Sequence, residues 1–176
     1  MNKEITGKDL TSTKKPSVSP EVFVAAMAAA AFGVCIVTTD GQAGRFGLTV
    51  SAVTSVSAEP PLLLVCINRK NVIAAAITAN QHFVVNMLSR EQQALAQIFA
   101  GRPSQGEAYD FSAAKWQIEQ GMPVLLEATA NFVCNLESFV DAGTHRIFIG
   151  RAAHAIHGGH SPLVYNNRGF GKFEKL

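Results

Sequence analysis

Charged side chains are scarce in this sequence: they make up 16% of its 176 residues, whereas 48% of the residues are hydrophobic. Because the surface of a small monomer needs charge to stay in solution, we expect another subunit to cover part of it. A homodimer is the commonest closed oligomer. The net charge is only +2, and the first 19 residues carry all of it. The neutral remainder argues against a basic face that binds nucleic acid.

Cysteine is equally sparse, and long hydrophobic runs are missing. Cys35, Cys66 and Cys134 lie far apart in apolar stretches, without a CxxC pair. We interpret them as reduced thiols in a reducing compartment. No hydrophobic run approaches the roughly 20 residues of a membrane span, and the N-terminus lacks an apolar signal segment. We expect a soluble cytoplasmic protein without membrane contacts.

The common nucleotide-binding, hydrolase and metal motifs are also missing. The sequence contains no GxGxxG after its first strand, no GxxxxGK[ST], no GxSxG and no HExxH, so a bound nucleotide would need a different cradle. His154, His157 and His160 are spaced by three, which on a strand points neighbouring members to opposite faces. We therefore predict no metal site.

The pattern along the chain predicts a flexible tail over residues 1–18 and one domain over 19–176. Ser19 and Pro20 are typical of a helix start, and this helix is expected to run to about Ala31. Further helices are expected over 71–80 and from Ser89, and 101–121 is expected to be irregular. Strands are expected as a hairpin over 34–57, a strand buried on both faces over 62–68, and then over 82–88, 124–139, 145–157 and 162–166. The fold class is mainly β, a Greek-key barrel with about three short peripheral helices.

The stretch from Gly47 to Ala58 carries a row of short hydroxyl side chains and no charge. As one strand, it would place Thr49, Ser51, Val53, Ser55 and Ser57 on the same face. That face is either the solvated side of an ordinary strand or a platform for a flat polar heterocycle that approaches the main chain closely. Exposed strands usually carry Lys, Glu or Arg, but the pattern alone leaves both readings open.

Two short segments could hold a phosphate, and one histidine could act in a cleft. Asn68, Arg69 and Lys70 precede a helix start, where free N–H groups and cations favour an anion. Gly101 and Arg102 follow a helix and form the second segment. His145 follows Gly143-Thr144 at the start of an apolar strand. The alternatives are a solvated turn for the basic residues and, for His145, a strand-end side chain bonded to a backbone carbonyl.

One family resemblance combines these features. "AAFGVCIVTTDGQAGRFGLTVSAVTSVSAEPPLLLVCINR" resembles the flavin reductase-like proteins of the FMN-binding split-barrel class, and "FVVNML", "FAG", "GTHRIFIG" and "PLVYNNRGFGKF" follow in the family's order. The chain looks like the small reductase component of two-component aromatic monooxygenases, of the 4-hydroxyphenylacetate or chlorophenol type. The resemblance implies a homodimer of split β-barrels, with FMN or FAD near the interface and NADH as hydride donor.

The resemblance also assigns roles to individual residues. His145 matches the family's histidine near the nicotinamide and is the expected catalytic residue. Tyr165, Arg168 and Phe170 lie in a closing motif beside the site, where "NNRGFGKF" departs somewhat from the usual pattern of an aromatic pair after a basic residue. The expected flavin contacts along the ring, at the phosphate turn and at the second loop are Thr49, Ser51, Ala52, Val53, Thr54, Asn68, Arg69, Lys70, Ala100, Gly101 and Arg102.

The function implied is that of an NAD(P)H:flavin oxidoreductase, which reduces FMN or FAD and supplies free reduced flavin to a separate oxygenase component. Hydride transfer between two flat rings needs no nucleophile, which agrees with the missing catalytic motifs. Two alternatives stay open. The protein could retain its flavin and pass electrons to another acceptor such as a corrinoid, or it could be a flavin-binding module without turnover.

Overall fold

The computed structural model describes residues 17–175. The tail expected over 1–18 therefore lies almost entirely outside the described residues. Within them the chain is mainly β, with three α-helices, which confirms the predicted fold class. None of the helices in the described part is long and apolar enough to span a membrane.

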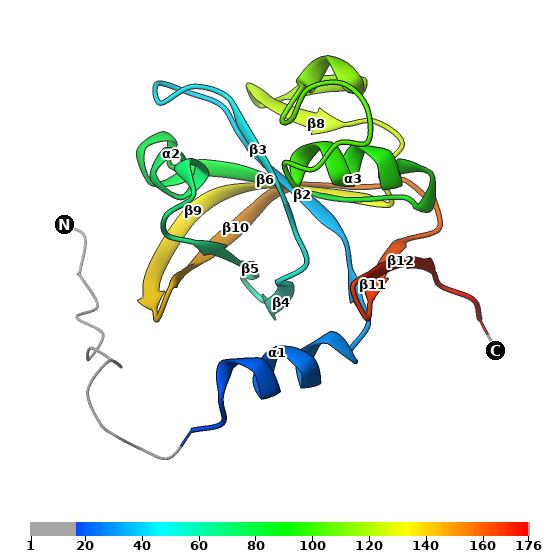
Figure 1. Cartoon of the computed structure of the whole chain (residues 1–176). Coiled ribbons are helices and arrows are strands. Elements are labelled where there is room, and N and C mark those ends of the chain that lie inside the picture. Colours follow the sequence, from blue (N-terminus) through cyan, green and yellow to red (C-terminus); the bar gives the residue numbers. More distant parts are fainter. Residues whose placement is uncertain (1–16, 176) are drawn as a thin grey trace.

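The main element is a seven-stranded antiparallel sheet (Figure 1). Its order is β3-β2-β6-β9-β10-β5-β4, so β3 and β4 form its two edges although only Ser51 and Ala52 separate them in the chain. The sheet must therefore curl until its two edges come close together. The result is an open barrel, because β3 and β4 do not pair with each other. The strands are β2 (Cys35–Thr39), β3 (Phe46–Val50), β4 (Val53–Ala58), β5 (Pro61–Asn68), β6 (His82–Met87), β9 (Ala130–Ala142) and β10 (His145–His157).

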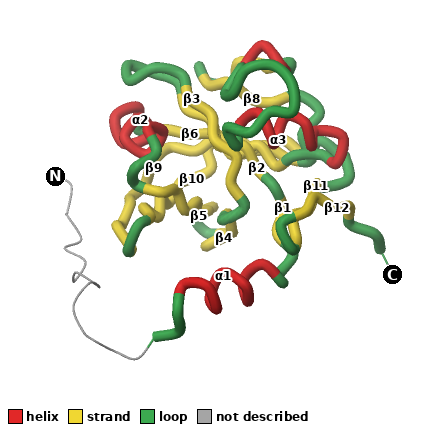
Figure 2. Tube along the Cα trace, in the orientation of Figure 1, coloured by secondary structure: helices red, strands yellow, loops and turns green. Residues whose placement is uncertain are grey.

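Smaller elements surround the barrel (Figure 2). A three-stranded sheet contains β1 (Phe32–Gly33), β11 (Leu163–Asn166) and β12 (Gly169–Lys172), and a hairpin contains β7 (Trp116–Glu119) and β8 (Met122–Leu125). The helices are α1 (Pro20–Ala28), α2 (Val72–Asn80) and α3 (Gln93–Phe99), with single 3₁₀ turns at 90–92 and 111–113. Ser19 caps α1 as expected, and Asn71, expected as the first residue of its helix, caps α2; each side chain accepts a backbone N–H of the first turn.

Two buried clusters hold these layers together. Val37, Val65, Phe83 and Phe148 fill the barrel interior beneath α2. Ile36, Leu88, Phe99 and Leu163 join β2, α3 and β11 on the other face of β2. Because β2 has a core on both sides, all five of its residues are buried, and it fixes β3 and β11 relative to each other.

The structure corrects several sequence-based expectations. The strand expected over 47–57 is broken at Ser51 and Ala52, because β3 pairs with β2 whereas β4 pairs with β5. The prediction that 62–68 is buried on both faces was wrong: burial alternates along β5, because Leu62, Leu64 and Cys66 face the outside of the barrel. The first helix ends at Ala28 rather than Ala31, and β7 and β12 were not predicted. The strand expected over 124–139, for which a break was allowed, is divided between β8 and β9.

Candidate functional site

A cleft of about 340 Å³ lies between β3, the end of α3 and the β11–β12 hairpin. This volume is at the lower end of the range for small-molecule sites. We call it the β3–α3 cleft. Its lining residues are Val34, Thr49, Val50, Ser51, Gln97, Ala100, Arg102, Tyr165, Arg168 and Phe170.

The floor of the cleft depends on close packing of β3 against α3. A Cβ at Gly47 would lie 2.5 Å from a ring carbon of Phe99, so only glycine allows this approach. The Thr49 hydroxyl then donates a hydrogen bond to the Ala96 carbonyl, at 2.8 Å. Its lone pairs remain available as acceptors. Ser51 follows at the bend where the chain leaves one sheet edge for the other.

The end of α3 places Ala100 and Arg102 at the cleft through a Schellman motif. The Arg102 N–H donates to the Gln97 carbonyl at 2.9 Å, and the Gly101 N–H donates to the Ile98 carbonyl at 3.1 Å. Gly101 has φ +72°, and a Cβ there would lie 2.5 Å from the Tyr109 hydroxyl. The segment "FAGR" is therefore a helix stop that needs glycine, and the stop sets the direction of the chain at Arg102.

The β11–β12 hairpin supplies an aromatic wall and a cation. Tyr165 and Phe170 are cross-strand partners with ring centroids 5.3 Å apart, in an edge-to-face arrangement. The turn between the strands consists of Asn167 and Arg168, whose φ values are +47° and +64°. The Asn167 N–H donates to the Ala28 carbonyl at 2.7 Å, so the end of α1 holds the turn in place.

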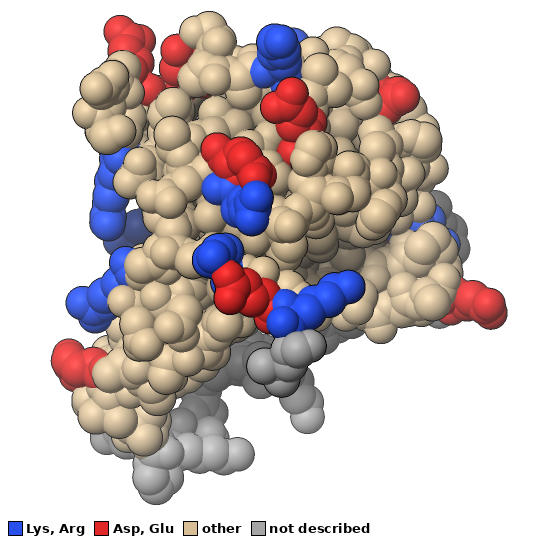
Figure 3. All heavy atoms as spheres, turned by 90° about the vertical axis from the view of Figure 1, so that its right-hand side faces the viewer, with Lys and Arg blue, Asp and Glu red and all other residues tan. Residues whose placement is uncertain are grey.

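The β3–α3 cleft has positive charge without a counter-charge. Arg102 and Arg168 are exposed at its rim, and among the described residues neither forms a salt bridge. No carboxylate is among the residues that line it. On the face shown in Figure 3, by contrast, Lys and Arg lie beside Asp and Glu among large uncharged areas. The cleft is therefore suited to a ligand with an apolar flat part and an anionic group.

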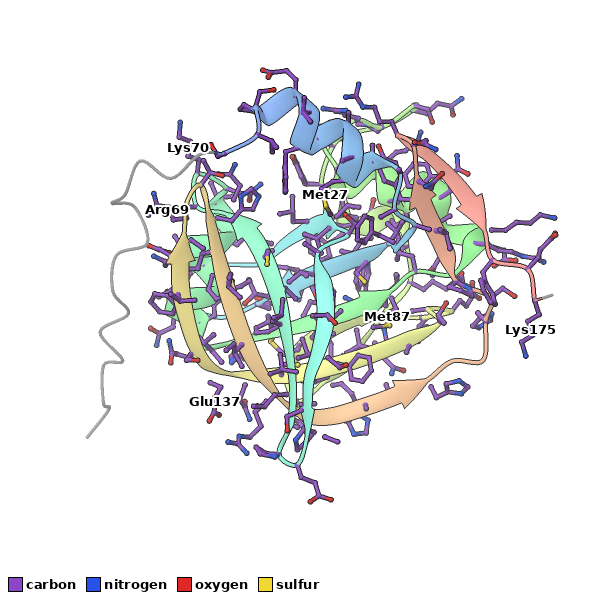
Figure 4. The ribbon with its side chains drawn as sticks, turned by 90° about the horizontal axis from the view of Figure 1, so that it is seen from below. Met27, Arg69, Lys70, Met87, Glu137 and Lys175 are labelled. Atoms are coloured by element: carbon purple, nitrogen blue, oxygen red, sulfur yellow. The ribbon has the colours of Figure 1, made fainter. Side chains whose placement is uncertain are left out.

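A second cavity, of about 430 Å³, lies at the end of β5 and is lined by Asn68, Arg69, Lys70, Asp141, Thr144 and Arg146. Arg69 and Lys70 lie together at one edge of the molecule (Figure 4). Asp141 accepts from Arg146 Nε at 2.7 Å and from Arg69 Nη1 at 3.2 Å. Hydrogen bonds from Arg146, and then from Arg69, lower the pKa of Asp141 to about 2. Much of the positive charge here is thus already paired.

His145 adjoins this second cavity. It is exposed, lies opposite Asn68 on β5, and its Nδ1 is 2.9 Å from the Thr144 hydroxyl. The preceding turn contains Gly143 with φ +57°, which ends β9 and begins β10. The expected strand-start position of His145 is confirmed.

The predicted site residues therefore fall into two groups. The β3–α3 cleft unites Thr49, Ser51, Ala100, Arg102, Tyr165, Arg168 and Phe170, and the second cavity holds Asn68, Arg69 and Lys70 beside His145. The side chain of Val53 packs against the barrel core, and Ala52, Thr54 and Gly101 line neither cavity. The sequence reasoning missed Val34, Val50 and Gln97. Only Gln97 carried a signal, because it lies three residues before Ala100 on a helical face.

Among the described residues, no group of three or more His, Cys, Asp or Glu side chains could hold a metal ion.

The chain matches the flavin reductase like domain family over residues 27–174. It is 43% identical over 156 residues to an FMN reductase (NADH) RutF of Variovorax paradoxus, covering 87% of this chain and 86% of that protein.

Two solved structures are also similar. The flavin reductase PheA2 in its native state superposes with a TM-score of 0.82 at 29% identity, covering 90% of this chain and 100% of that one. BorF, the flavin reductase component of a bacterial two-component tryptophan halogenase, gives a TM-score of 0.80 at 28% identity with the same coverage.

Proposed function

The chain belongs to the flavin reductase like domain family and is an NADH-dependent flavin reductase, and on this premise we propose that the β3–α3 cleft holds the flavin. A bound flavin would supply the hydride acceptor and a bound nicotinamide the hydride donor. The protein has to bind both flat molecules, orient them and exclude water.

The observation that carries this proposal is the combination of groups in one cleft. Tyr165, Phe170 and Val50 offer apolar contacts to a flat ring, the Thr49 and Ser51 hydroxyls offer hydrogen bonds to its polar edge, and two arginines face an anionic tail. Ala100 and the backbone at Gly101 complete the loop beside Arg102. Ala52, Val53 and Thr54 continue the chain from Ser51, and their backbone groups are proposed as further contacts with the ring.

Asn68, Arg69 and Lys70 were predicted to contact the flavin phosphate, and this stays a prediction. Their cavity is separate from the β3–α3 cleft within one chain, and Asp141 already pairs with Arg69. Lys70 forms no salt bridge among the described residues. Comparing the binding affinities for FMN and riboflavin tests whether this turn contacts the phosphate, because only FMN carries one. An Arg69→Ala, Lys70→Ala double variant that loses both ligands equally would remove the turn from phosphate binding.

We assign His145 the role of orienting the nicotinamide. Hydride transfer requires no general base, and the hydrogen bond between Thr144 and His145 restrains the ring beside Thr144, which lines the second cavity. The side chain is exposed in a single chain. A second molecule, either the dinucleotide or a partner subunit, is therefore needed to enclose it.

The reduced flavin is proposed to leave the protein and to serve a separate oxygenase component. The arginines lie at the rim rather than inside, so the cleft does not enclose its ligand fully. The likeness to BorF, a reductase component of a two-component system, supports the same arrangement. The chain is also proposed to act as a homodimer, because apolar side chains such as Val22 and Phe23 are exposed in a single chain.

The test is NADH oxidation by the purified protein with and without added FMN, FAD or riboflavin. Turnover that requires added flavin and saturates with it supports a diffusible product, and the half-saturation values identify the preferred flavin. Protein that purifies with stoichiometric flavin and needs no addition would instead support electron transfer to another acceptor. Flavin binding without any NADH oxidation would contradict the reductase assignment.

A further inference from the structure

We propose that Trp116, which lies outside the β3–α3 cleft, is a positioning residue: it connects the β7–β8 hairpin to α3 and so fixes the distance between α3 and β3 on which the cleft depends. The proposal rests on the proposed binding of flavin in that cleft. It gives a function to the segment 111–126, none of which lines the cleft.

Side chains, rather than a strand ladder, attach the β7–β8 hairpin to the barrel. The hairpin is a separate two-stranded sheet. The Thr38 hydroxyl donates to the Pro123 carbonyl at 2.9 Å, and the Asn131 amide donates to the Leu125 carbonyl at 3.1 Å. Asn86 Oδ1 accepts the Leu125 N–H at 2.9 Å. These three polar side chains are at most 4% exposed. Because a buried backbone group left unpaired is costly, the hairpin is held in one position.

Trp116, at the start of β7, extends this fixed position to the end of α3. Its ring packs edge-to-face on Phe99, with centroids 5.8 Å apart, and its Nε1 donates to the Phe111 carbonyl at 2.8 Å. The Phe111 ring also packs edge-to-face on Phe99, at 5.0 Å. Phe99 is fully buried, and its ring lies against the β3 backbone at Gly47. Phe99 therefore stays against β3 only while the two neighbouring rings enclose it.

The segment that follows the hairpin restrains the other end of α3. The Gln92 side chain, one residue before the helix, donates to the Leu126 carbonyl at 2.8 Å. The Leu126 N–H in turn donates to the carbonyl of Lys115, next to Trp116, at 3.1 Å. Both ends of α3 are thus attached to the β7–β8 hairpin and its flanking residues.

The cleft depends on how α3 lies against β3. Thr49 lines the cleft and donates to the Ala96 carbonyl at 2.8 Å. Ala100 directly follows Phe99 and lines the cleft from the end of α3. A shift of α3 away from β3 would weaken the Thr49 bond and move Ala100. Misplacement by about 1 Å can slow an orientation-dependent reaction on the order of a hundredfold. Trp116 thus acts on the flavin without touching it.

The test uses Trp116 itself as a reporter, because the sequence contains a single tryptophan. Trp116→Leu removes the aromatic contacts, and Trp116→Phe keeps a ring at the same place. Thr38→Val has nearly the same shape as the wild-type residue but removes one anchor of the hairpin. Ile118→Ala is the control on the same strand, where the side chain is 59% exposed. Ile73→Ala is the stability control, because it removes a buried side chain from the other core cluster.

We expect Trp116→Leu to bind FMN and riboflavin about three- to tenfold more weakly in a flavin fluorescence titration. Both ligands should be affected equally, because they share the ring. Trp116→Phe should recover most of the affinity. Thr38→Val should move the Trp116 emission to longer wavelength and weaken flavin binding in the same direction. Ile118→Ala and Ile73→Ala should keep the wild-type affinity, although Ile73→Ala lowers the thermal midpoint.

A purely structural role for Trp116 predicts different results. Unchanged flavin affinity in folded Trp116→Leu, with a lowered thermal midpoint, would overturn the proposal. Equal weakening by Ile73→Ala would also overturn it, because loss of stability anywhere would then suffice. If Trp116→Leu does not fold, Thr38→Val decides the question. Wild-type affinity in Thr38→Val despite a shifted emission would refute the coupling, and an unshifted emission would refute the anchoring of the hairpin.

Ser51→Tyr separates these results from a failure of the proposed function. Ser51 lines the cleft, and a tyrosine there fills the space in which the flavin is proposed to bind. This variant should lose flavin binding. Wild-type affinity in Ser51→Tyr would refute the proposed flavin site itself. Loss of binding in Ser51→Tyr, together with unchanged affinity in Trp116→Leu, would refute only the positioning role of Trp116.

Discussion

At the scale of single residues, a substitution at His145 should affect the use of NADH without affecting the binding of flavin. Because it lies by the second cavity and not in the β3–α3 cleft, His145→Ala should raise the KM for NADH severalfold and leave riboflavin binding unchanged. His145→Gln, which keeps a hydrogen-bonding group, should recover part of the loss. His157→Ala, at the far end of β10, is the control. Steady-state kinetics at low NADH check this, and an unchanged rate would remove His145 from the site.

Asp141 makes the second cavity sensitive to acid, and the direction follows from its pKa. Hydrogen bonds from Arg146 and Arg69 lower that pKa from 3.8 to about 2 in the folded chain. The stabilisation is therefore fully present above about pH 4 and is lost as the pH falls towards 2. Urea unfolding over this range should show a small loss of stability, because the pairs are partly exposed. Asp141→Asn should flatten this part of the profile; an equally steep profile would contradict the assignment.

At the scale of elements, the sequence predicts a helix or strand correctly where neighbouring residues alone determine it. Ser19 with Pro20 predicted the cap and the start of α1, and the helix start expected at Asn71 is confirmed to within one residue, because Asn71 caps α2. The break at Ser51 and Ala52 had no local signal. It exists because β3 and β4 pair with strands on opposite sides of the sheet. Consequently the hydroxyl row divides: Thr49 and Ser51 reach the cleft, whereas Ser55 and Ser57 stay on β4.

The same limit applies to the site. The segments around Thr49, Arg102 and Arg168 could be recognised from the sequence, but their meeting in one cleft depends on β2, which is buried on both faces. Nor could the sequence show that Arg69 lies in a different cavity and already has Asp141 as a partner. Strand pairing between residues far apart in the sequence determines both the composition of the cleft and the position of Arg69.

The helix stop after α3 can be tested with two matched glycines. Gly101 and Gly106 have similar positive φ values, +72° and +79°, but only at Gly101 would a Cβ meet a neighbour, the Tyr109 hydroxyl. Gly106→Ala should cost about 1 kcal/mol of stability from backbone strain alone. Gly101→Ala should cost more and also weaken FMN binding, because it displaces Arg102. Chemical denaturation and flavin titration measure both. Identical losses for the two variants would contradict a steric role for Gly101.

At the scale of the whole molecule, two apolar surfaces lack a cover in a single chain. No residue of α1 is buried, and Val22 and Phe23 are 58% and 57% exposed. A nine-residue helix is not stable alone in water. Among the described residues, the hydrogen bonds that tie α1 to another element join its C-terminal end to the β11–β12 turn. The outer face of β5 and β10 carries a partly buried apolar row of Leu64, Cys66, Ile147 and Ile149. Exposed apolar side chains like those of α1 mark interaction surfaces when they lie together.

A second copy of the chain, the partner proposed above, could cover both surfaces at once, since a two-fold dimer can place each α1 against the other barrel. Val22→Asp with Phe23→Asp should therefore convert a dimer into monomers in sedimentation equilibrium. Ile118→Asp, on β7, changes a side chain that is 59% exposed and should leave the mass unchanged. Because α1 also holds the turn that contains Arg168, dissociation should weaken FMN binding more than riboflavin binding. A wild-type chain that sediments as a monomer would refute the dimer, and a dimer that persists in the double variant would place the interface elsewhere.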